Sequence, residues 1–99
     1  MIMMQMKWPE ASVDQYDEVK RRVNWEGQKP DGAIFHTTAH DGNGLVITDV
    51  WRSADEFQRF IDSRVMPVVK ELGVPGEPQV EIYEAHDVFA PAFEPSVLR

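Results

Sequence analysis

The spacing of hydrophobic residues switches between a period of two and a period near four along the chain, and each stretch predicts one element. Met1–Lys7 alternates imperfectly and is interpreted as a strand. Ser12 and Gln15 then have the S-x-x-Q spacing of a capping box, and apolar side chains recur at helical spacing as far as Val23. The chain is therefore expected to begin with a strand followed by a helix.

Two further strand patterns follow, with a turn between them. Asn24–Gly32 holds two glycines and a proline and is expected to be an ordered loop that carries Trp25. Ala33–Ala39 is interpreted as the second strand, and a turn over His40–Gly44 leads into a third strand over Leu45–Arg52. Two strand patterns joined by a glycine-rich turn predict a β-hairpin.

A second amphipathic helix is expected directly after this hairpin. Ser53 and Glu56 have the spacing of another capping box, and apolar residues follow at helical spacing. Pro67 lies inside this helix. Because proline lacks a backbone N–H and clashes with the preceding turn, a kink or short break is expected near residues 65–66. Gly73 is expected to follow the last helical residue in the left-handed conformation.

A fourth strand over Gln79–His86 completes the order β-α-β-β-α-β, which is typical of the ferredoxin-like fold. This order predicts an α+β protein with a four-stranded antiparallel sheet and both helices on one face. Residues 1–91 are assigned to this single domain, and residues 92–99 are expected to form an extended C-terminal tail.

The free face of the predicted sheet is expected to be covered. The third strand has two mostly apolar alternating sets, Leu45, Ile47 and Trp51 on one side and Val46, Thr48 and Val50 on the other. A sheet with one face in water alternates more cleanly between apolar and polar residues. A 99-residue chain has no third layer to cover that face, so a second copy is expected, and the two sheets would form a dimeric α/β barrel.

The charge balance limits the partners of the chain. Its formal charge is −7, from 17 acidic and 10 basic residues, and this charge repels phosphate backbones and anionic membranes. Neither nucleic acid nor a membrane is therefore expected as a partner. The sequence has no cysteine, which excludes disulfides and thiolate metal sites and fits a reducing cytoplasm. The N-terminal stretch lacks the basic region and cleavage site of a signal peptide, so a cytoplasmic location is expected.

The strand-to-helix stretch DVWRSADEFQRF, Asp49–Phe60, resembles a junction found in a known family. It is similar to the acidic-x-Trp-x-Ser/Asp junction of antibiotic-biosynthesis-monooxygenase-like (ABM) domains, which belong to the dimeric α/β-barrel superfamily. The proline and glycine after the second helix, together with VEIYEAHDVF at Val80–Phe89, resemble small actinobacterial members of this class. The resemblance spans Met1–Pro91. It implies a homodimer with a central barrel, helices outside and a pocket in each half.

The chain departs from this family at one informative position. Many ABM-like monooxygenases and haem-degrading relatives carry a histidine in the second helix, where this chain has Phe60 and Ile61. No histidine lies anywhere in Ser53–Gly73, so an axial ligand for haem is missing. Haem is therefore not expected, and the resemblance to cofactor-independent members implies no other cofactor.

Strand alternation groups the candidate site residues into three sets. These sets are Ile34, His36 and Thr38; Ile47, Asp49 and Trp51; and Val80, Ile82, Glu84 and His86. They are expected to share the face of the sheet that points away from the helices and to line a cavity there. A few polar groups in an apolar concavity are typical of a small-molecule site.

Roles can be assigned within this expected cavity. His36 or His86 would be the general base, with Asp49 as its orienting or hydrogen-bonding partner. Trp51 would be the wall on which a flat aromatic substrate stacks. The remaining substrate-binding candidates are Glu84, Ile34 and Ile82.

Each of these side chains also has a structural interpretation. The two histidines could be satisfied at the edge of the core. Asp49 could pair with a nearby arginine or a base of the partner chain, Glu84 could be a solvent-exposed carboxylate, and Trp51 could simply pack in the core. Tyr16 and Trp25 are expected to pack around the first helix. A metal bound by His36, His86 and Asp49 is chemically permissible, but those residues have no local spacing signature, so no metal is expected.

Two functions remain open at this stage. The resemblance implies a cofactor-independent monooxygenase that acts on an electron-rich aromatic or quinol-like substrate. The alternative is a non-catalytic homodimeric module that binds a ligand or takes part in an assembly. A cavity packed shut by its own side chains would argue against any substrate.

Overall fold

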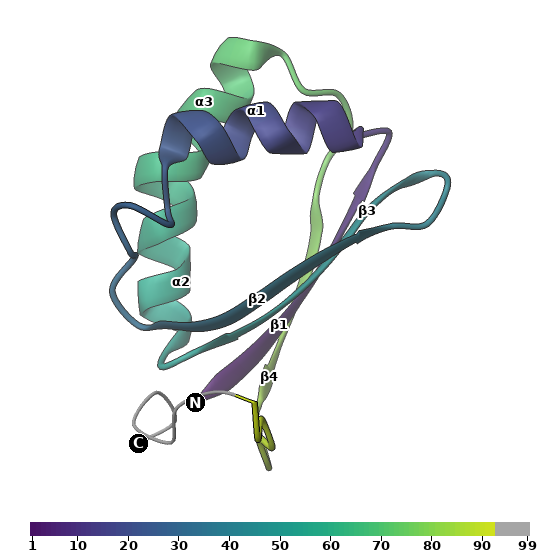
Figure 1. Ribbon diagram of the computed structural model, residues 1–99. Coiled ribbons are helices and arrows are strands. Elements are labelled where there is room, and N and C mark those ends of the chain that lie inside the picture. Colours follow the sequence, from purple (N-terminus) through teal and green to yellow (C-terminus); the bar gives the residue numbers. More distant parts are fainter. Residues whose placement is uncertain (93–99) are drawn as a thin grey trace.

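A computed structural model of the chain describes residues 1–92, and its elements follow the predicted order (Figure 1). They are β1 (Ile2–Pro9), α1 (Val13–Val23), β2 (Ala33–His40), β3 (Gly44–Trp51), α2 (Ala54–Phe60), the π-helical segment η1 (Ile61–Val65), α3 (Met66–Leu72) and β4 (Gln79–Glu84). The predicted tail, residues 92–99, lies outside the described residues except for its first position. The helices lie on one side of the sheet, as Figure 1 shows.

The four strands form one antiparallel sheet in the order β2-β3-β1-β4. This order and the βαββαβ succession are those of the ferredoxin-like fold, so the predicted fold class is confirmed. The strand β1 lies between β3 and β4, with Met4 opposite Asp49 on one side and opposite Ile82 on the other. Strands β2 and β3 form the predicted hairpin.

A capping box was predicted at the start of both helices, and only the one at Ser12 is complete. Ser12 forms the full capping box, because its hydroxyl accepts from the Gln15 amide at 3.1 Å and the Gln15 side chain accepts from the Ser12 amide at 2.8 Å. Ser53 accepts from the Glu56 amide at 3.2 Å, but the Glu56 carboxylate does not return to the Ser53 backbone. It binds the Ser53 hydroxyl and the Arg52 guanidinium instead. The second box is therefore only half formed.

Glycine is required beside this carboxylate. Gly32 has φ +83°, and a Cβ atom there would lie 2.6 Å from Cδ of Glu56. The Gly32 carbonyl also accepts from the Arg52 amide at 2.8 Å. The loop before β2 is thereby held against the start of α2.

The second long helix changes its winding instead of breaking. The π-helical turn over Ile61–Val65 comes directly before α3, which begins at Met66 and has Pro67 in its first turn. The predicted irregularity near residues 65–66 is thus present as the boundary between a π-helical and an α-helical segment. Single π-turns of this kind are frequent at functional sites. The helix ends as predicted at Gly73, which has φ 64°.

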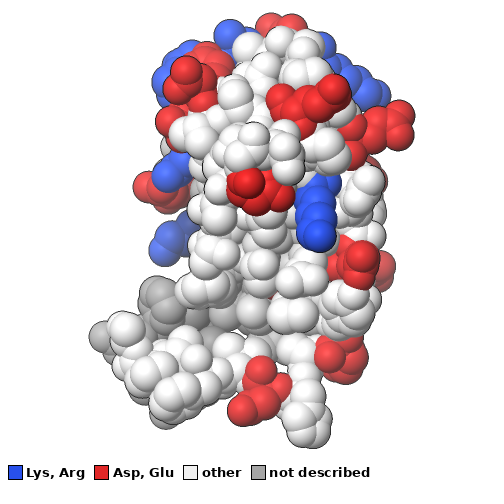
Figure 2. Space-filling view, turned by 90° about the vertical axis from the view of Figure 1, so that its right-hand side faces the viewer, with Lys and Arg blue, Asp and Glu red and all other residues white. Residues whose placement is uncertain are grey.

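The core lies between the helices and one face of the sheet. Its buried apolar residues are Ile2, Met4, Met6, Trp8, Ala11, Val19, Val23, Leu45, Ile47, Trp51, Phe57, Val65 and Val69. Residues of the opposite sheet face, such as Met3, Val46 and Val50, are only half-buried. Figure 2 views the molecule from the side of that opposite face and shows a broad band of uncharged atoms across it.

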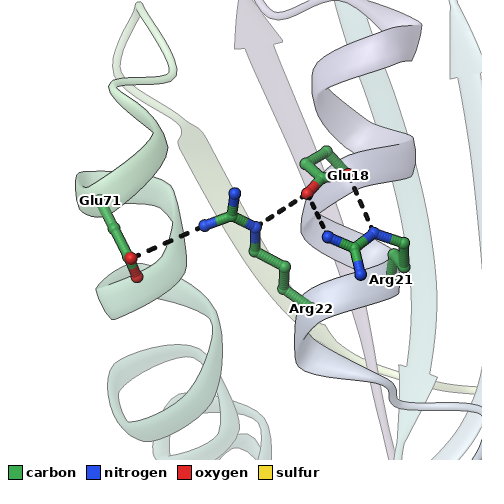
Figure 3. A network of polar contacts seen from close by, with 4 residues as sticks. All are labelled: Glu18, Arg21, Arg22 and Glu71. Atoms are coloured by element: carbon green, nitrogen blue, oxygen red, sulfur yellow. Dashed lines mark hydrogen bonds and ion pairs between the residues drawn. The ribbon is translucent and has the colours of Figure 1, made fainter.

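Ionic contacts also join α1 to α3 (Figure 3). Glu18 on α1 accepts from the Arg21 Nη2 at 2.6 Å and from the Arg22 Nε at 2.8 Å. Arg22 also reaches Glu71 on α3, with 3.7 Å between Nη1 and Oε1. The hydrogen bonds from Arg21, which has the larger effect, and from Arg22 lower the pKa of Glu18 to about 2.

Candidate functional site

A one-residue bulge in β2 sets the register of the candidate site. Ala33 lies opposite Trp51, but Phe35 lies opposite Val50 and His36 opposite Asp49, so the register shifts by one residue between Ala33 and Phe35. Without the shift, Phe35 would face Asp49. Bulges are common beside active sites because they re-aim a side chain. Here the bulge places the imidazole of His36 beside the carboxylate of Asp49.

Asp49 is buried and has both carboxylate oxygens engaged. Its Oδ1 lies 2.6 Å from Nδ1 of His36, and its Oδ2 accepts from the indole N–H of Trp51 at 3.0 Å. The Asp49 side chain is 7% exposed and that of His36 is 36% exposed. The pair therefore has a dry carboxylate at its inner end and an accessible imidazole at its outer end.

The hydrogen bonds assign the tautomer of this imidazole. A carboxylate only accepts, so Nδ1 of a neutral His36 carries the proton and donates it to Asp49. The other ring nitrogen, Nε2, then has a lone pair. It accepts from the Tyr16 hydroxyl at 2.6 Å and lies 3.0 Å from the Thr38 hydroxyl. The geometry thus gives His36 the acceptor nitrogen of a general base.

Tyr16 closes over this nitrogen from α1. Its ring is stacked on that of His36, with centroids 6.1 Å apart and planes inclined by 12°. Burial is the main cause that raises the pKa of the Tyr16 phenol above its usual value. Tyr16 therefore stays a neutral hydroxyl over the physiological pH range. In this structure it donates the hydrogen bond that Nε2 of His36 accepts.

An apolar cavity of about 110 Å³ opens beside these groups. The aromatic side chains that line this aromatic cavity are Trp8, Tyr16, Trp25, Phe35, Trp51, Phe57 and Phe60. Its polar lining groups are Gln15, Tyr16, His36 and Asp49. Trp51 lies 5.6 Å from Phe57 and 5.5 Å from Phe60 between ring centroids. The core side chains leave the cavity open, so the chain has room for a small ligand.

The cavity lies on the helix-covered face, and this corrects the predicted location. The alternate β3 residues that were expected to point away from the helices are buried beneath them. Trp51 contacts two rings of α2, and His36 bonds to Tyr16 of α1. The alternation correctly grouped His36, Asp49 and Trp51 on one face, but it could not say which face the helices cover.

The other predicted site residues do not line this cavity. Ile34 is the extra residue of the bulge, so it loses the alternation that grouped it with His36. Ile82 and Glu84 lie on the edge strand β4, whose side chains are all exposed, and Glu84 approaches the N-terminal amine at 3.8 Å. His86 is exposed and follows the end of β4. The expectation that all of these residues share one cavity is therefore wrong.

Sequence reasoning missed the aromatic residues that complete the site. Tyr16 and Trp25 were expected to pack around the first helix, yet both line the cavity and contact His36. The ring centroid of Trp25 lies 5.5 Å from that of His36. Tyr16 lies in the first turn of α1 and Trp25 just after its end. No local pattern places either beside His36, because the contacts join residues far apart in the sequence.

The metal triad considered from the sequence is not assembled. Within residues 1–92, no three His, Asp or Glu side chains are grouped in a way that could hold a metal ion. His36 and Asp49 adjoin each other, and His86 lies elsewhere.

Within residues 1–92, no helix has the length and apolarity needed to cross a bilayer.

Comparison with solved structures gives clear matches, although the sequence matches no family model and no curated protein significantly. SnoaB, a cofactor-independent oxygenase from Streptomyces nogalater, superposes with a TM-score of 0.62 at 16% identity, covering 88% of this chain and 93% of SnoaB. Protein NE2512 of unknown function from Nitrosomonas europaea gives 0.68 at 11% identity, covering 93% and 95%. Rv0793 from Mycobacterium tuberculosis gives 0.61 at 13% identity, covering 90% and 98%.

Identities this low show a shared fold only. The chain therefore has the fold of structures that include a cofactor-independent oxygenase and three proteins provisionally assigned as antibiotic biosynthesis monooxygenases. The likeness to ABM domains inferred from the junction at Asp49–Phe60 agrees with these neighbours. The likeness to small actinobacterial members stays a prediction.

Proposed function

We propose that the chain binds a small electron-rich aromatic molecule in the aromatic cavity and oxygenates it with molecular oxygen, without a bound cofactor. One observation carries the proposal: a buried carboxylate, Asp49, holds the Nδ1 proton of His36 so that Nε2 faces a cavity walled by aromatic rings. The fold shared with SnoaB supports the same reaction class.

The size of the cavity favours a single-ring substrate. An apolar cavity of about 150 Å³ is known to hold one benzene molecule. The cavity here is about 110 Å³, so a fused ring system would need the surrounding side chains to move. A quinol, which is a benzene ring with two hydroxyl groups, is at the upper limit of this size, and its hydroxyl protons suit the acid–base chemistry of His36.

The first step is a proton transfer. A quinol hydroxyl that displaces the Tyr16 hydroxyl from His36 gives its proton to Nε2, and the quinol becomes an anion. Asp49 then faces an imidazolium and stabilises its charge, as the carboxylate does in a Ser-His-Asp triad. Burial of the Asp49 carboxylate strengthens this attraction, because little water screens that end of the pair. Trp51 forms part of the ring-binding wall.

The oxidation that follows needs molecular oxygen as its only co-reactant. The anion passes one electron to O₂, and the resulting semiquinone and superoxide join through a new bond between a ring carbon and oxygen. Protonation gives a hydroperoxide, whose O–O bond breaks with loss of water and leaves a carbonyl. The sum is quinol plus O₂ giving hydroxyquinone plus water. The substrate loses four electrons and O₂ gains four, so no outside reductant is needed.

We also propose that the chain works as a homodimer in the cytoplasm. The sheet face opposite the helices carries half-buried Met3, Val46 and Val50 in the single chain. Figure 2 shows few charges over that face. Replacing Val50 with Lys would place a charge there, and sedimentation should then change from a dimer to a single chain. A native protein that sediments as a single chain at micromolar concentration would contradict the dimer.

Oxygen uptake tests the proposed reaction. The native protein should accelerate O₂ consumption by hydroquinone and its methyl derivatives, and mass spectrometry should find one oxygen atom from ¹⁸O₂ in the product. His36→Gln should abolish the acceleration, whereas His40→Ala, at the exposed end of β2, should keep it. His86→Ala should also keep it, because His86 does not line the cavity. Native protein that binds a quinol without consuming oxygen would support the alternative, a non-catalytic ligand-binding module.

A further inference from the structure

A second hollow adjoins the aromatic cavity and is lined mainly by charged residues. It measures about 260 Å³ and is lined by Lys29, Pro30, Asp31, Glu56, Arg59, Phe60, Ser63 and Arg64. Pro30 and Phe60 line the aromatic cavity as well, so the two spaces meet at these residues. The hollow, called the basic hollow below, is not used by the proposed proton transfer.

Basic groups outside the close ion pairs collect at this place. Within residues 1–92, the four lysines and arginines in ion pairs are Lys20, Arg21, Arg22 and Arg52. The remaining five are Lys7, Lys29, Arg59, Arg64 and Lys70, and three of those five line the basic hollow. In a chain whose formal charge is −7, such a gathering is a local exception to the overall charge.

The net charge of the residues that line the basic hollow suits a ligand with a single negative charge. Lys29, Arg59 and Arg64 carry three positive charges, while Asp31 and Glu56 carry two negative ones, which leaves a net charge of +1. Glu56 is also already bound by Arg52 from outside the hollow. A phosphate dianion would meet the repulsion of both carboxylates with too little compensation. A carboxylate matches the net charge, and a guanidinium can bind it with two parallel hydrogen bonds.

Phe60 connects the two spaces physically. The guanidinium of Arg64 lies 5.1 Å from the centroid of the Phe60 ring, and the Arg64 Nη2 donates to the Val23 carbonyl at 3.0 Å. The same ring packs 5.5 Å from Trp51 in the aromatic cavity. Arg64 is thus fixed by two contacts. Lys29 and Arg59 are in none of the close ion pairs of the described residues, although the charge of Arg59 acts on the Glu56 carboxylate nearby. Their donor groups can therefore still reach a ligand.

We propose that the basic hollow binds the carboxylate of an aromatic acid whose ring occupies the aromatic cavity. The inference deepens the proposed function, because it names aromatic carboxylates as the substrate class of the same site. The ligand would lie between Pro30 and Phe60, with its ring toward Trp51 and its carboxylate toward Arg59 and Lys29.

Binding experiments test this inference independently of turnover. The probes are 4-hydroxybenzoate and 4-hydroxybenzamide, which share a ring and a phenol and differ in charge at neutral pH. Titration calorimetry on the native protein should find the acid bound at least about tenfold more tightly than the amide, equivalent to about 1.4 kcal/mol. The preference should shrink as salt is added, because salt screens the attraction to partly exposed cations.

Variants locate the charge that is responsible. Arg59→Gln and Lys29→Gln should each weaken binding of the acid about tenfold or more, the usual effect of losing a hydrogen bond to a charged group, and leave the amide unchanged. Lys70→Gln removes an equal charge from α3, outside both spaces, and should change neither. Arg64 is a poorer choice, since its replacement also removes the contacts with Phe60 and Val23.

Three results would overturn the inference: equal binding of acid and amide, no binding of either at millimolar concentration, or undiminished binding of the acid in both variants. Failure of the proposed reaction looks different. In that case no quinol is oxidised, while the charge-dependent preference for 4-hydroxybenzoate persists and supports a carboxylate-binding site.

Discussion

His36 faces Asp49 across the β2–β3 ladder with 2.6 Å between Nδ1 and Oδ1, and a single extra residue in β2 brings the two together. The same carboxylate accepts from Trp51, which lines the cavity. Base, orienting carboxylate and aromatic wall are therefore joined by two hydrogen bonds to one buried side chain. A change at Asp49 is expected to alter all three.

Asp49→Asn should remove activity with little loss of stability. The asparagine oxygen can still accept from Trp51, while its NH₂ group would donate to Nδ1 of His36. The imidazole would then carry its proton on Nε2 and could no longer accept one from a substrate. We expect quinol-dependent oxygen uptake to fall about 10²- to 10⁴-fold. The free energy of unfolding should fall by only about 1 kcal/mol.

The matched control is Asp55→Asn in the exposed first turn of α2, which should retain uptake. Oxygen uptake by Asp49→Asn within twofold of native would contradict the role given to the carboxylate. A much larger loss of stability would instead assign Asp49 mainly to the core.

Tyr16→Phe should free the acceptor nitrogen of His36. The native hydroxyl donates to Nε2 at 2.6 Å, so a phenolic ligand must displace it. Without the hydroxyl, 4-hydroxybenzamide should bind more tightly, by about the five- to tenfold that a neutral hydrogen bond contributes. Calorimetry with benzamide, which lacks the phenol, provides the control and should show no gain. Weaker binding of 4-hydroxybenzamide to the variant would mean that Tyr16 holds the ligand instead of competing with it.

The fold was accessible from the sequence because local signals agreed with one another. The period change at Ser53, the capping box at Ser12 and the glycine at position 73 each fixed an element boundary without reference to distant residues. The element order then left few topologies. The face that the helices cover was not accessible, because both alternating sets of β3 are apolar enough to form a core.

The site was accessible only in part. His36, Asp49 and Trp51 follow from alternation on two paired strands, and the structure brings them together. The alternation rule assigned Ile34 to the wrong set, because a bulge inserts one residue there. None of the residue types at that point indicates a bulge. It also could not bring Tyr16 to His36, since that contact depends on how α1 crosses the sheet.

Glu56 should make stability depend on acid pH. Hydrogen bonds from Arg52 and then Ser53 lower its pKa to about 2, against 4.5 for an unperturbed glutamate. The unfolded chain therefore binds this proton more readily than the folded one. The stabilisation is complete above about pH 4.5 and is lost as the pH falls toward 2.

Glu56→Gln should accordingly be less stable than the native protein at pH 7, and the difference should shrink between pH 4.5 and pH 2. Denaturant unfolding at several pH values measures this difference. Glu18 titrates in the same window, but it is present in both proteins and cancels. A difference that stays constant across the window would show that the carboxylate charge does not contribute.

Adjacent methionines in β1 should respond differently to the same substitution. Met4 is 1% exposed beneath the helices, whereas Met3 is half-buried on the opposite face. Met4→Ala should lower the free energy of unfolding by about 2–5 kcal/mol because it leaves a cavity in the core. Met3→Ala should cost less and should instead weaken the proposed dimer. Equal losses of stability, or a larger one for Met3, would contradict the assignment of the two faces.

The most direct test of the account is the position of the proton on His36 at neutral pH. A long-range ¹H–¹⁵N correlation spectrum distinguishes the two ring nitrogens of each histidine. The hydrogen bonds to Asp49, Tyr16 and Thr38 predict a proton on Nδ1 and a lone pair on Nε2. A quinol ligand should move the Nε2 signal toward its protonated value. A His36 that carries its proton on Nε2 in the free protein would contradict its role as the base.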